Sequence, residues 1–272
     1  MLNSMKNFFS TRLRPNSSNN NFEELILPAR IGLYSLYLKV KNDEEYTNVF
    51  ELCKELIEKN PLSEKENMRL NNSLFYNDVD SKQISQTYLF FDYDGHNNHI
   101  GDGIIYNDVV NKMLELFDNE TENGKLYVNY PMLESLRHFN NLQQCMQNNI
   151  SCLTKVSDGK KYKQIVNAEG MSKDWSNFDL ACWEWSLVLF LYRISCLFDV
   201  VGCIDFYEYK QLVNPLSLFK KQMEKHGIDT IMLISSLPAF IYDYFKEEQV
   251  FCYFEVASKK HINHCDFKGN QH

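Results

Sequence analysis

Several common catalytic signatures are missing from this chain of 272 residues. It has no glycine-rich phosphate loop and no Walker lysine motif, and no Ser-His-Asp set can be recognised in it. Chemistry that depends on those motifs is therefore not expected. Internal repeats at solenoid or propeller periods are also missing, so we expect one large domain or a core domain with an elaboration.

Positive charge is scarce, because 28 Lys and Arg face 36 Asp and Glu and leave a formal net charge of −8. Such a chain lacks the diffuse positive field of a protein dedicated to binding duplex nucleic acid. If it acts on nucleic acid, metal ions or a partner subunit must supply much of the charge that faces the phosphates.

No two of the eight cysteines form a CxxC pair, and most of them lie in apolar runs. Scattered buried thiols are typical of a reducing compartment, whereas a disulfide framework is expected mainly in smaller secreted domains. We therefore predict free structural thiols and a cytoplasmic protein. The cysteines are Cys53, Cys145, Cys152, Cys182, Cys196, Cys203, Cys252 and Cys265.

The first 22 residues contain no acidic residue and no continuous apolar stretch. A disordered leader over residues 1–21 is the favoured interpretation, and a transit peptide is the alternative. The best candidate for a membrane span, Leu180 to Phe198, is interrupted by Glu184 and Arg193. Charges near the centre of a span are costly, so we predict a buried helix there and no membrane association.

The clearest pattern begins at Thr87 to Phe91, a short apolar run that indicates a strand covered on both faces. An amphipathic helix is predicted from Asp102-Gly103, followed by a turn at Asn123-Gly124 and a second strand from Lys125 to Tyr130. Pro131 is then expected in the first turn of another helix. This order predicts parallel strands joined by a right-handed crossover.

Three acidic residues follow these two strands. Asp92 and Asp94 come at the end of the first strand, and Glu134 follows the second. Because the working edge of a parallel sheet lies at the carboxyl ends of its strands, all three are expected to meet there. Carboxylates in this arrangement favour Mg²⁺ or Mn²⁺ and metal-assisted phosphodiester chemistry. The alternative is turn chemistry, since Asp-x-Asp-Gly also suits a loop.

The segments Leu89 to His96 and Asn123 to Ser135 together resemble the TOPRIM half-site of bacterial antiphage proteins, the OLD-like (overcoming lysogenization defect) and abortive-infection nucleases. The resemblance covers residues 85–138 well and the rest loosely, including Leu233 to Phe245. It implies that Asp92 and Asp94 bind Mg²⁺, that Glu134 is a further catalytic or metal-binding residue, and that an ATPase subunit is the partner.

One feature of that family has no counterpart here. TOPRIM proteins begin with a strand that ends in Glu-Gly, whose glutamate acts as general acid/base or metal ligand. The candidate N-terminal strand, Phe22 to Leu27, has Glu23 and Glu24 near its start and no Glu-Gly after it. Glu169-Gly170 lies in the wrong part of the chain.

Three other clusters carry weaker signals, and solvated loops or tails are the favoured interpretation of each. His96 and His99 follow the aspartates and could contact a phosphate or a metal. A zinc site at His261, His264 and Cys265 has no evident fourth ligand. Tyr162, between lysines at positions 160–163, could grip a phosphate backbone.

The sequence thus predicts an α/β protein with a Rossmann-like, TOPRIM-type parallel sheet and a helical elaboration. The expected parts are a disordered leader (1–21), an α/β core (22–140), the elaboration (141–227) and a C-terminal strand and helix returning to the core (228–272). Two functions remain open. One is a Mg²⁺-dependent nuclease that acts on DNA or RNA beside an ATPase subunit. The other is a catalytically incomplete binding or regulatory subunit that acts through protein contacts.

Overall fold

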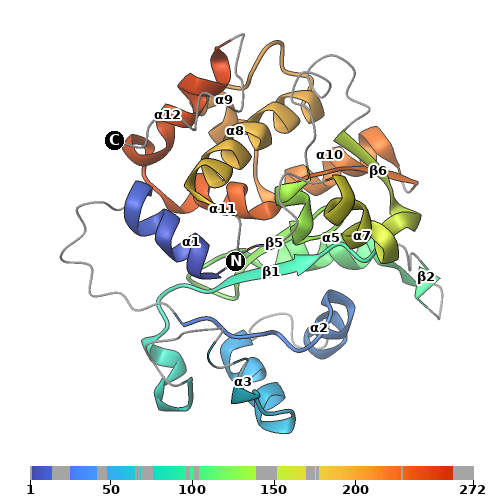
Figure 1. Ribbon diagram of the computed structural model, residues 1–272. Coiled ribbons are helices and arrows are strands. Elements are labelled where there is room, and N and C mark those ends of the chain that lie inside the picture. The colour runs from blue at the N-terminus through green and yellow to red at the C-terminus, as the bar shows by residue number, and fades with distance from the viewer. Residues whose placement is uncertain are drawn as a thin grey trace.

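A small mixed sheet lies between helices in the computed structural model, with α8 and α11 on one side and α2 and α3 on the other in the view of Figure 1. The structure describes residues 2–13, 25–41, 48–64, 66, 68, 76–95, 99–100, 104–138, 152–169, 175, 178–227 and 229–259. Its helices are α1 (Leu2–Phe8), α2 (Leu33–Val40), α3 (Val49–Lys59), α5 (Tyr106–Leu116), α7 (Gly159–Glu169), α8 (Leu180–Leu197), α9 (Phe206–Leu212), α10 (Pro215–His226), α11 (Ser236–Tyr244) and α12 (Glu247–Ser258).

The strands are short. They are β1 (Tyr88–Asp92), β2 (His99–Ile100), β3 (Ile104–Ile105), β4 (Asp118–Asn119), β5 (Gly124–Asn129), β6 (Leu153–Lys155) and β7 (Thr230–Met232). A π-helical turn, η1 (Phe9–Leu13), follows α1, and short 3₁₀ helices occur at η2 (Tyr76–Asp78), η3 (Ser81–Gln83), η5 (Leu133–Arg137) and η7 (Val156–Asp158).

The predicted parallel pair is confirmed, because β1 and β5 run parallel with Asp92 opposite Asn129. The larger parallel sheet is not found among the described residues. β4 pairs with β5 in the antiparallel direction, across a turn in which Gly124 has a φ of +111°. β7 returns as predicted but pairs antiparallel with β6, and an isolated bridge from Tyr130 to Ile234 connects this pair to the end of β5.

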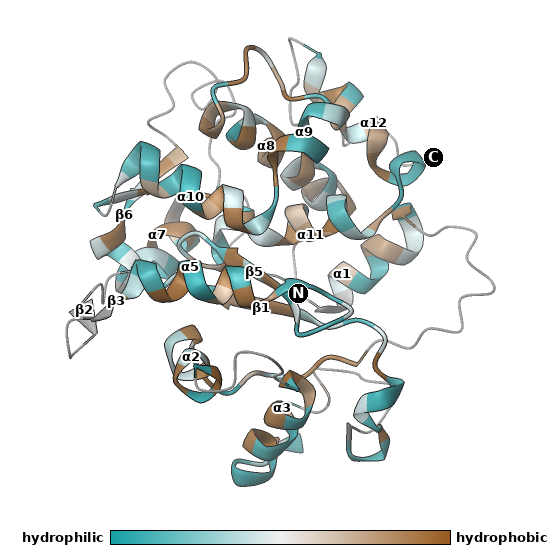
Figure 2. Ribbon diagram, turned by 180° about the vertical axis from the view of Figure 1, so that it is seen from behind, coloured by the Kyte–Doolittle hydropathy of each residue, from teal (hydrophilic) through white to brown (hydrophobic). Residues whose placement is uncertain are grey.

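The side chains of β1 and β5 explain why only one of these strands is central. β5 is buried along nearly its whole length, and Figure 2 shows both strands in the brown of hydrophobic residues. In β1, Leu89 and Phe91 are buried, but Phe90 is 38% exposed. The prediction that this strand is covered on both faces holds in part: Leu89 and Phe91 are buried on one face, and Phe240 of α11 packs on Tyr88 and Phe90 on the other but leaves Phe90 partly exposed.

Two predicted helix starts differ from the structure. α5 begins at Tyr106, and the predicted start at Asp102-Gly103 lies outside the described residues. Pro131 does not begin an α-helix. It follows a cis peptide bond with Tyr130, and the chain then forms η5 from Leu133.

The start of the chain is not a disordered leader over residues 2–13, which form α1 and η1 and pack on α8. Phe8 is fully buried and stacks on Trp183 with ring centroids 5.6 Å apart. The Trp183 indole donates a hydrogen bond to Ser4 Oγ at 2.8 Å, and Arg12 pairs with Glu184 at 2.9 Å. Positions 14–21 of the predicted leader lie outside the described residues.

α8 is a buried helix, as predicted. Its length and composition would suit a membrane span, but 78% of it is buried inside the protein. Asp179 caps its start by accepting a hydrogen bond from the Cys182 amide at 2.8 Å. One large hydrophobic cluster includes residues from Phe8 to Ala257, and Tyr162, Val166 and Leu233 form a second, small one. The predicted boundaries at 140 and 227 stay predictions.

The six cysteines that the structure describes follow the prediction with one exception. Cys53, Cys182, Cys196, Cys203 and Cys252 are free thiols, and burial raises the pKa of Cys53 to about 11. Cys152 is part of a disulfide bond. The prediction of a free thiol is therefore wrong at Cys152.

Candidate functional site

Asp92 occupies the carboxyl end of β1 and is held there by two hydrogen bonds. Its Oδ1 accepts one from the Leu133 amide at 2.9 Å and one from the Asn129 side-chain amide at 3.1 Å. The first bond forms because the chain turns back after β5 and brings the start of η5 beside β1. One carboxylate oxygen of Asp92 is therefore used to join the two strand ends.

Asn129 is the polar centre of this edge, and only 2% of it is exposed. Its Oδ1 accepts hydrogen bonds from the Ser236 amide and hydroxyl, both at 2.9 Å, and from the Ser235 hydroxyl at 3.2 Å. Its amide nitrogen donates to Asp92 and to the Phe91 carbonyl. Asn129 thus connects the two parallel strands to the first residues of α11.

No motif in the sequence predicts this connection directly. The signal available was Ser235-Ser236 just before Pro238, a pattern typical of a helix start, together with an asparagine at the end of the second strand. Ser235 is indeed the N-cap of α11. The sequence does not predict the register of β1 and β5, which places Asn129 opposite Asp92.

Glu134 lies in η5 and is only 8% exposed, and its carboxylate forms an ion pair. Its Oε1 is 3.2 Å from Nζ of Lys163, an exposed residue of α7. Asp94 follows β1, and its backbone amide donates to the Tyr106 hydroxyl at 3.2 Å. The Tyr93 hydroxyl between the aspartates donates to Asn107 at 2.6 Å.

The three predicted acids are close enough to influence one another. Asp92 as a whole is exposed, but burial of its carboxyl group among neighbouring atoms raises its pKa to about 6. The charges of Glu134 and Asp94 raise it further, and the hydrogen bonds from Leu133 and Asn129 lower it. The carboxylates of Glu134 and Asp94 are therefore near enough to Asp92 to act on it electrostatically.

The donor set does not fit a three-carboxylate Mg²⁺ or Mn²⁺ site. Within the described part of the chain, no group of three or more His, Cys, Asp and Glu side chains is arranged to hold a metal ion. Asp92 uses one oxygen for two hydrogen bonds, and Glu134 already faces a lysine. The catalytic and metal-binding roles of Asp92, Asp94 and Glu134 stay predictions.

The raised pKa of Asp92 predicts a pH-dependent effect of Asp92→Asn. A carboxyl group whose pKa is higher in the folded state contributes stability at low pH, and this contribution is lost as pH rises from about 4 to about 6. Asp92→Asn should therefore raise the free energy of unfolding at pH 7.5 by about 1 kcal/mol, after allowance for solvent screening. Urea unfolding at pH 4 and pH 7.5 measures this, and equal differences at both pH values would contradict it.

The weaker clusters are only partly covered by the structure. His96, His261, His264 and Cys265 lie outside the described residues, and of His99 only the backbone, in β2, is described. The lysine-rich segment around Tyr162, for which a solvated loop was the favoured interpretation, is part of α7. Tyr162 is fully buried, with its hydroxyl 2.8 Å from the His138 ring, so it cannot stack on a nucleic acid.

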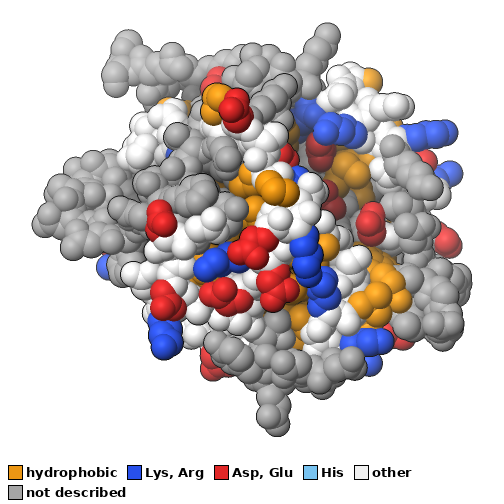
Figure 3. All heavy atoms as spheres, turned by 90° about the horizontal axis from the view of Figure 1, so that it is seen from below, with side chains coloured by type: hydrophobic (Ala, Val, Ile, Leu, Met, Phe, Trp, Pro, Cys, Tyr) orange, Lys and Arg blue, Asp and Glu red, His pale blue; other side chains and the backbone are white. Residues whose placement is uncertain are grey.

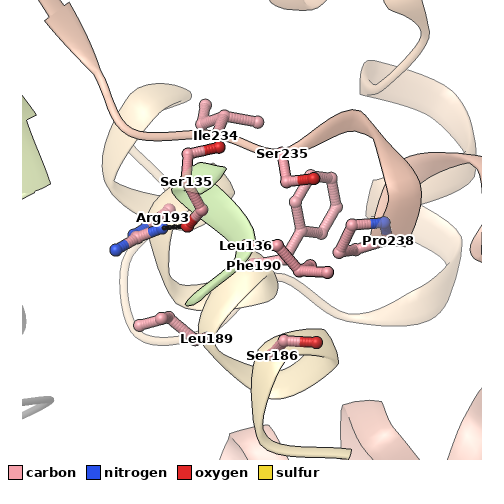
Figure 4. A pocket seen from close by; sticks show the side chains of 9 residues that line it. All are labelled: Ser135, Leu136, Ser186, Leu189, Phe190, Arg193, Ile234, Ser235 and Pro238. Atoms are coloured by element: carbon pink, nitrogen blue, oxygen red, sulfur yellow. Dashed lines mark hydrogen bonds between the residues drawn. The ribbon is translucent and has the colours of Figure 1, made fainter. Parts of the chain in front are cut away.

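Next to the acidic edge is a small cavity of about 10 Å³. Figure 4 shows Arg193 of α8 and Ser135 of η5 at this cavity, with Ser186 and Ser235 also lining it. Arg193 is 3% exposed and donates to the carbonyls of Ser135 and His138. A space of this size suits one water molecule and is too small for a substrate.

The surface viewed from below the molecule of Figure 1 carries both signs of charge. Figure 3 shows acidic and basic side chains interspersed there, with hydrophobic side chains between them. A continuous basic track of the kind that follows a phosphate backbone is not visible on the part of that face that the structure describes.

Comparisons with protein-family models, with curated proteins and with solved structures found no match for this chain.

Proposed function

We propose that this chain is a TOPRIM-like protein of antiphage defence that acts as a binding or regulatory subunit through protein contacts. The observation that carries this proposal is the hydrogen bonding of Asp92. A carboxylate whose oxygen accepts bonds from both Leu133 and Asn129 serves as a structural connector between strand ends. The family part of the proposal is supported only by the sequence resemblance over residues 85–138.

Two further features favour an incomplete catalytic site. Lys163 neutralises Glu134, the third acidic residue that a metal-dependent nuclease would need. The sequence also has no Glu-Gly after an N-terminal strand, and residues 25–30, where that strand would end, have no regular structure. An ATPase subunit is the proposed partner, following from the family resemblance, and the cytoplasm is the proposed location, following from the scattered free thiols.

Metal titration tests this proposal through thermal unfolding. An ion bound at a hundredfold excess over its Kd stabilises a protein by about 2.7 kcal/mol, which is roughly 5 °C or more for a chain of this size. We expect millimolar Mg²⁺ or Mn²⁺ to shift the Tm of the unmodified protein, of Asp92→Asn and of Glu122→Gln equally, within about 1 °C. Glu122→Gln removes one exposed negative charge elsewhere and controls for screening. A stabilisation that only Asp92→Asn loses would overturn the proposal.

The second candidate is the Mg²⁺-dependent nuclease. The observation that favours it is the acidic environment of Asp92, whose raised pKa reflects the nearby charges of Glu134 and Asp94 as well as burial. A nuclease assay on DNA and RNA with Mg²⁺ and Mn²⁺ separates the two candidates. Cleavage that Asp94→Ala abolishes would establish the nuclease, and cleavage unchanged by Asp94→Ala would indicate a contaminating enzyme.

A further inference from the structure

Within the part of the chain that the structure describes, the outer edge of β1 has no backbone partner. In a parallel ladder every second residue bonds to the neighbouring strand. The bonds of Thr87 with Lys125 and of Tyr93 with Asn129 show that the odd-numbered residues face β5. The N–H and C=O groups of Tyr88, Phe90 and Asp92 therefore point away from the sheet, and no other described strand pairs with β1.

β1 itself carries none of the residues, and no bulge, that usually protect an exposed strand edge. Proteins commonly protect edges with lysine, proline, bulges or a covering element, because open edges pair with other chains. β1 contains Tyr-Leu-Phe-Phe-Asp, with no lysine, proline or glycine, and pairs in register with β5 throughout. Phe90 at its middle is 38% exposed.

Aromatic packing holds this edge in place. Phe90 stacks on Tyr127 with centroids 5.4 Å apart and contacts Phe240 of α11 edge-on at 5.4 Å. Tyr88 contacts the same Phe240 at 4.9 Å and Tyr244 at 5.7 Å. An edge that is already ordered loses little conformational entropy when another strand pairs with it.

Both ends of β1 are acidic. Near the amino end, burial and then the charge of Glu120 raise the pKa of Tyr88. Asp243 also lies there, but it is paired with Lys125 at 3.0 Å. Asp92 forms the carboxyl end, and the whole chain carries a net charge of −8. A second copy of the chain would add like charge, whereas a basic segment would complement both ends.

We infer that the outer edge of β1 binds an extended segment of a partner protein by β-strand addition, with an apolar centre between two basic residues. Tyr88 and Asp92 are about 13 Å apart at roughly 3.3 Å per residue, so the basic residues should stand roughly four positions apart. This inference rests on the proposed binding function and specifies the partner's chemistry. It does not depend on whether Asp92 holds a metal.

Amide hydrogen exchange on the unmodified protein tests the edge itself. The amides of Phe90 and Asp92 should exchange at least about tenfold faster than those of Leu89 and Phe91, because only the latter bond to β5. Equal protection at odd and even positions would show that the edge is covered and would overturn the inference.

The partner is tested with a capped, fluorescein-labelled peptide containing Lys-Val-Thr-Val-Lys. Fluorescence anisotropy should show saturable binding, and the amides of Phe90 and Asp92 should become protected. The matched peptides Glu-Val-Thr-Val-Glu and Lys-Val-Pro-Val-Lys should bind at least about tenfold more weakly, because they lose charge complementarity and a central donor, respectively.

Two variants at one position separate backbone pairing from side-chain contact. Phe90→Pro removes an outward N–H while leaving the bonds to β5, so it should weaken peptide binding at least about tenfold. Phe90→Thr keeps that N–H and should retain binding. The inference would be overturned if Phe90→Pro left peptide binding unchanged. It would also be overturned if the peptide did not bind although hydrogen exchange showed the edge to be open. Self-association of the protein that Phe90→Pro abolishes would overturn it as well. Metal-dependent stabilisation would overturn the proposed function and leave these results unaffected.

Discussion

Asn129→Ala is expected to lower the free energy of unfolding by about 3 kcal/mol. The substitution removes the acceptor for the Ser236 amide and for the hydroxyls of Ser235 and Ser236. It also removes a donor to Asp92. Buried polar groups that lose their partners keep the cost of desolvation, so the effect exceeds that of one ordinary hydrogen bond.

Urea unfolding measures this effect, with Asn111→Ala as the matched control. Asn111 is a partly exposed residue of α5 whose side chain bonds only to Glu115 among the described contacts, and its removal should cost about 0.5 kcal/mol or less. If Asn129→Ala costs no more than Asn111→Ala, the connection between the strands and α11 does not exist as described.

Asn129→Asp gives a second test of the same network. The new carboxylate still accepts from the serines but cannot donate to Asp92, and it places a second negative charge beside that residue. Both groups should then have a raised pKa in the folded state. Because a carboxyl group with a raised pKa destabilises the folded state only when it is ionised, the variant should be least stable at neutral pH and should recover stability below about pH 5. A constant loss of stability across this range would contradict the expectation.

Phe8→Ala is expected to cost about 3–4 kcal/mol, measured by urea or thermal unfolding. Phe8 is fully buried and stacks on Trp183, so its truncation leaves a cavity beside α8. Phe251→Ala is a suitable control, because Phe251 is 36% exposed and its truncation should cost about 1 kcal/mol or less. A loss at Phe8 no larger than at Phe251 would mean that the start of the chain is a leader without a structural role.

The sequence predicted the elements whose signal is local. The apolar run before Asp92 predicted β1, and the Asn123-Gly124 turn predicted the start of β5. α8 was predicted as a buried helix from its charged interruptions. The acidic surroundings of Asp92 also followed from the rule that parallel strands end at one edge.

The features that were missed depend on long-range pairing. The docking of α1 could not be predicted, because Phe8 lies in a segment without a continuous apolar stretch and its partner Trp183 is far along the chain. The direction of β4 and the partner of β7 are set by tertiary contacts. The role of Asn129 depends on a strand register and on a helix more than 100 residues later.

A crystal structure of the protein soaked in millimolar Mn²⁺ tests the central claim most directly. Our account expects Asp92 to remain within hydrogen-bonding distance of the Leu133 amide and the Asn129 side chain, with no anomalous scattering peak beside it. A manganese ion bound by Asp92, Asp94 and Glu134, with Lys163 displaced, would show a complete metal site and contradict the account.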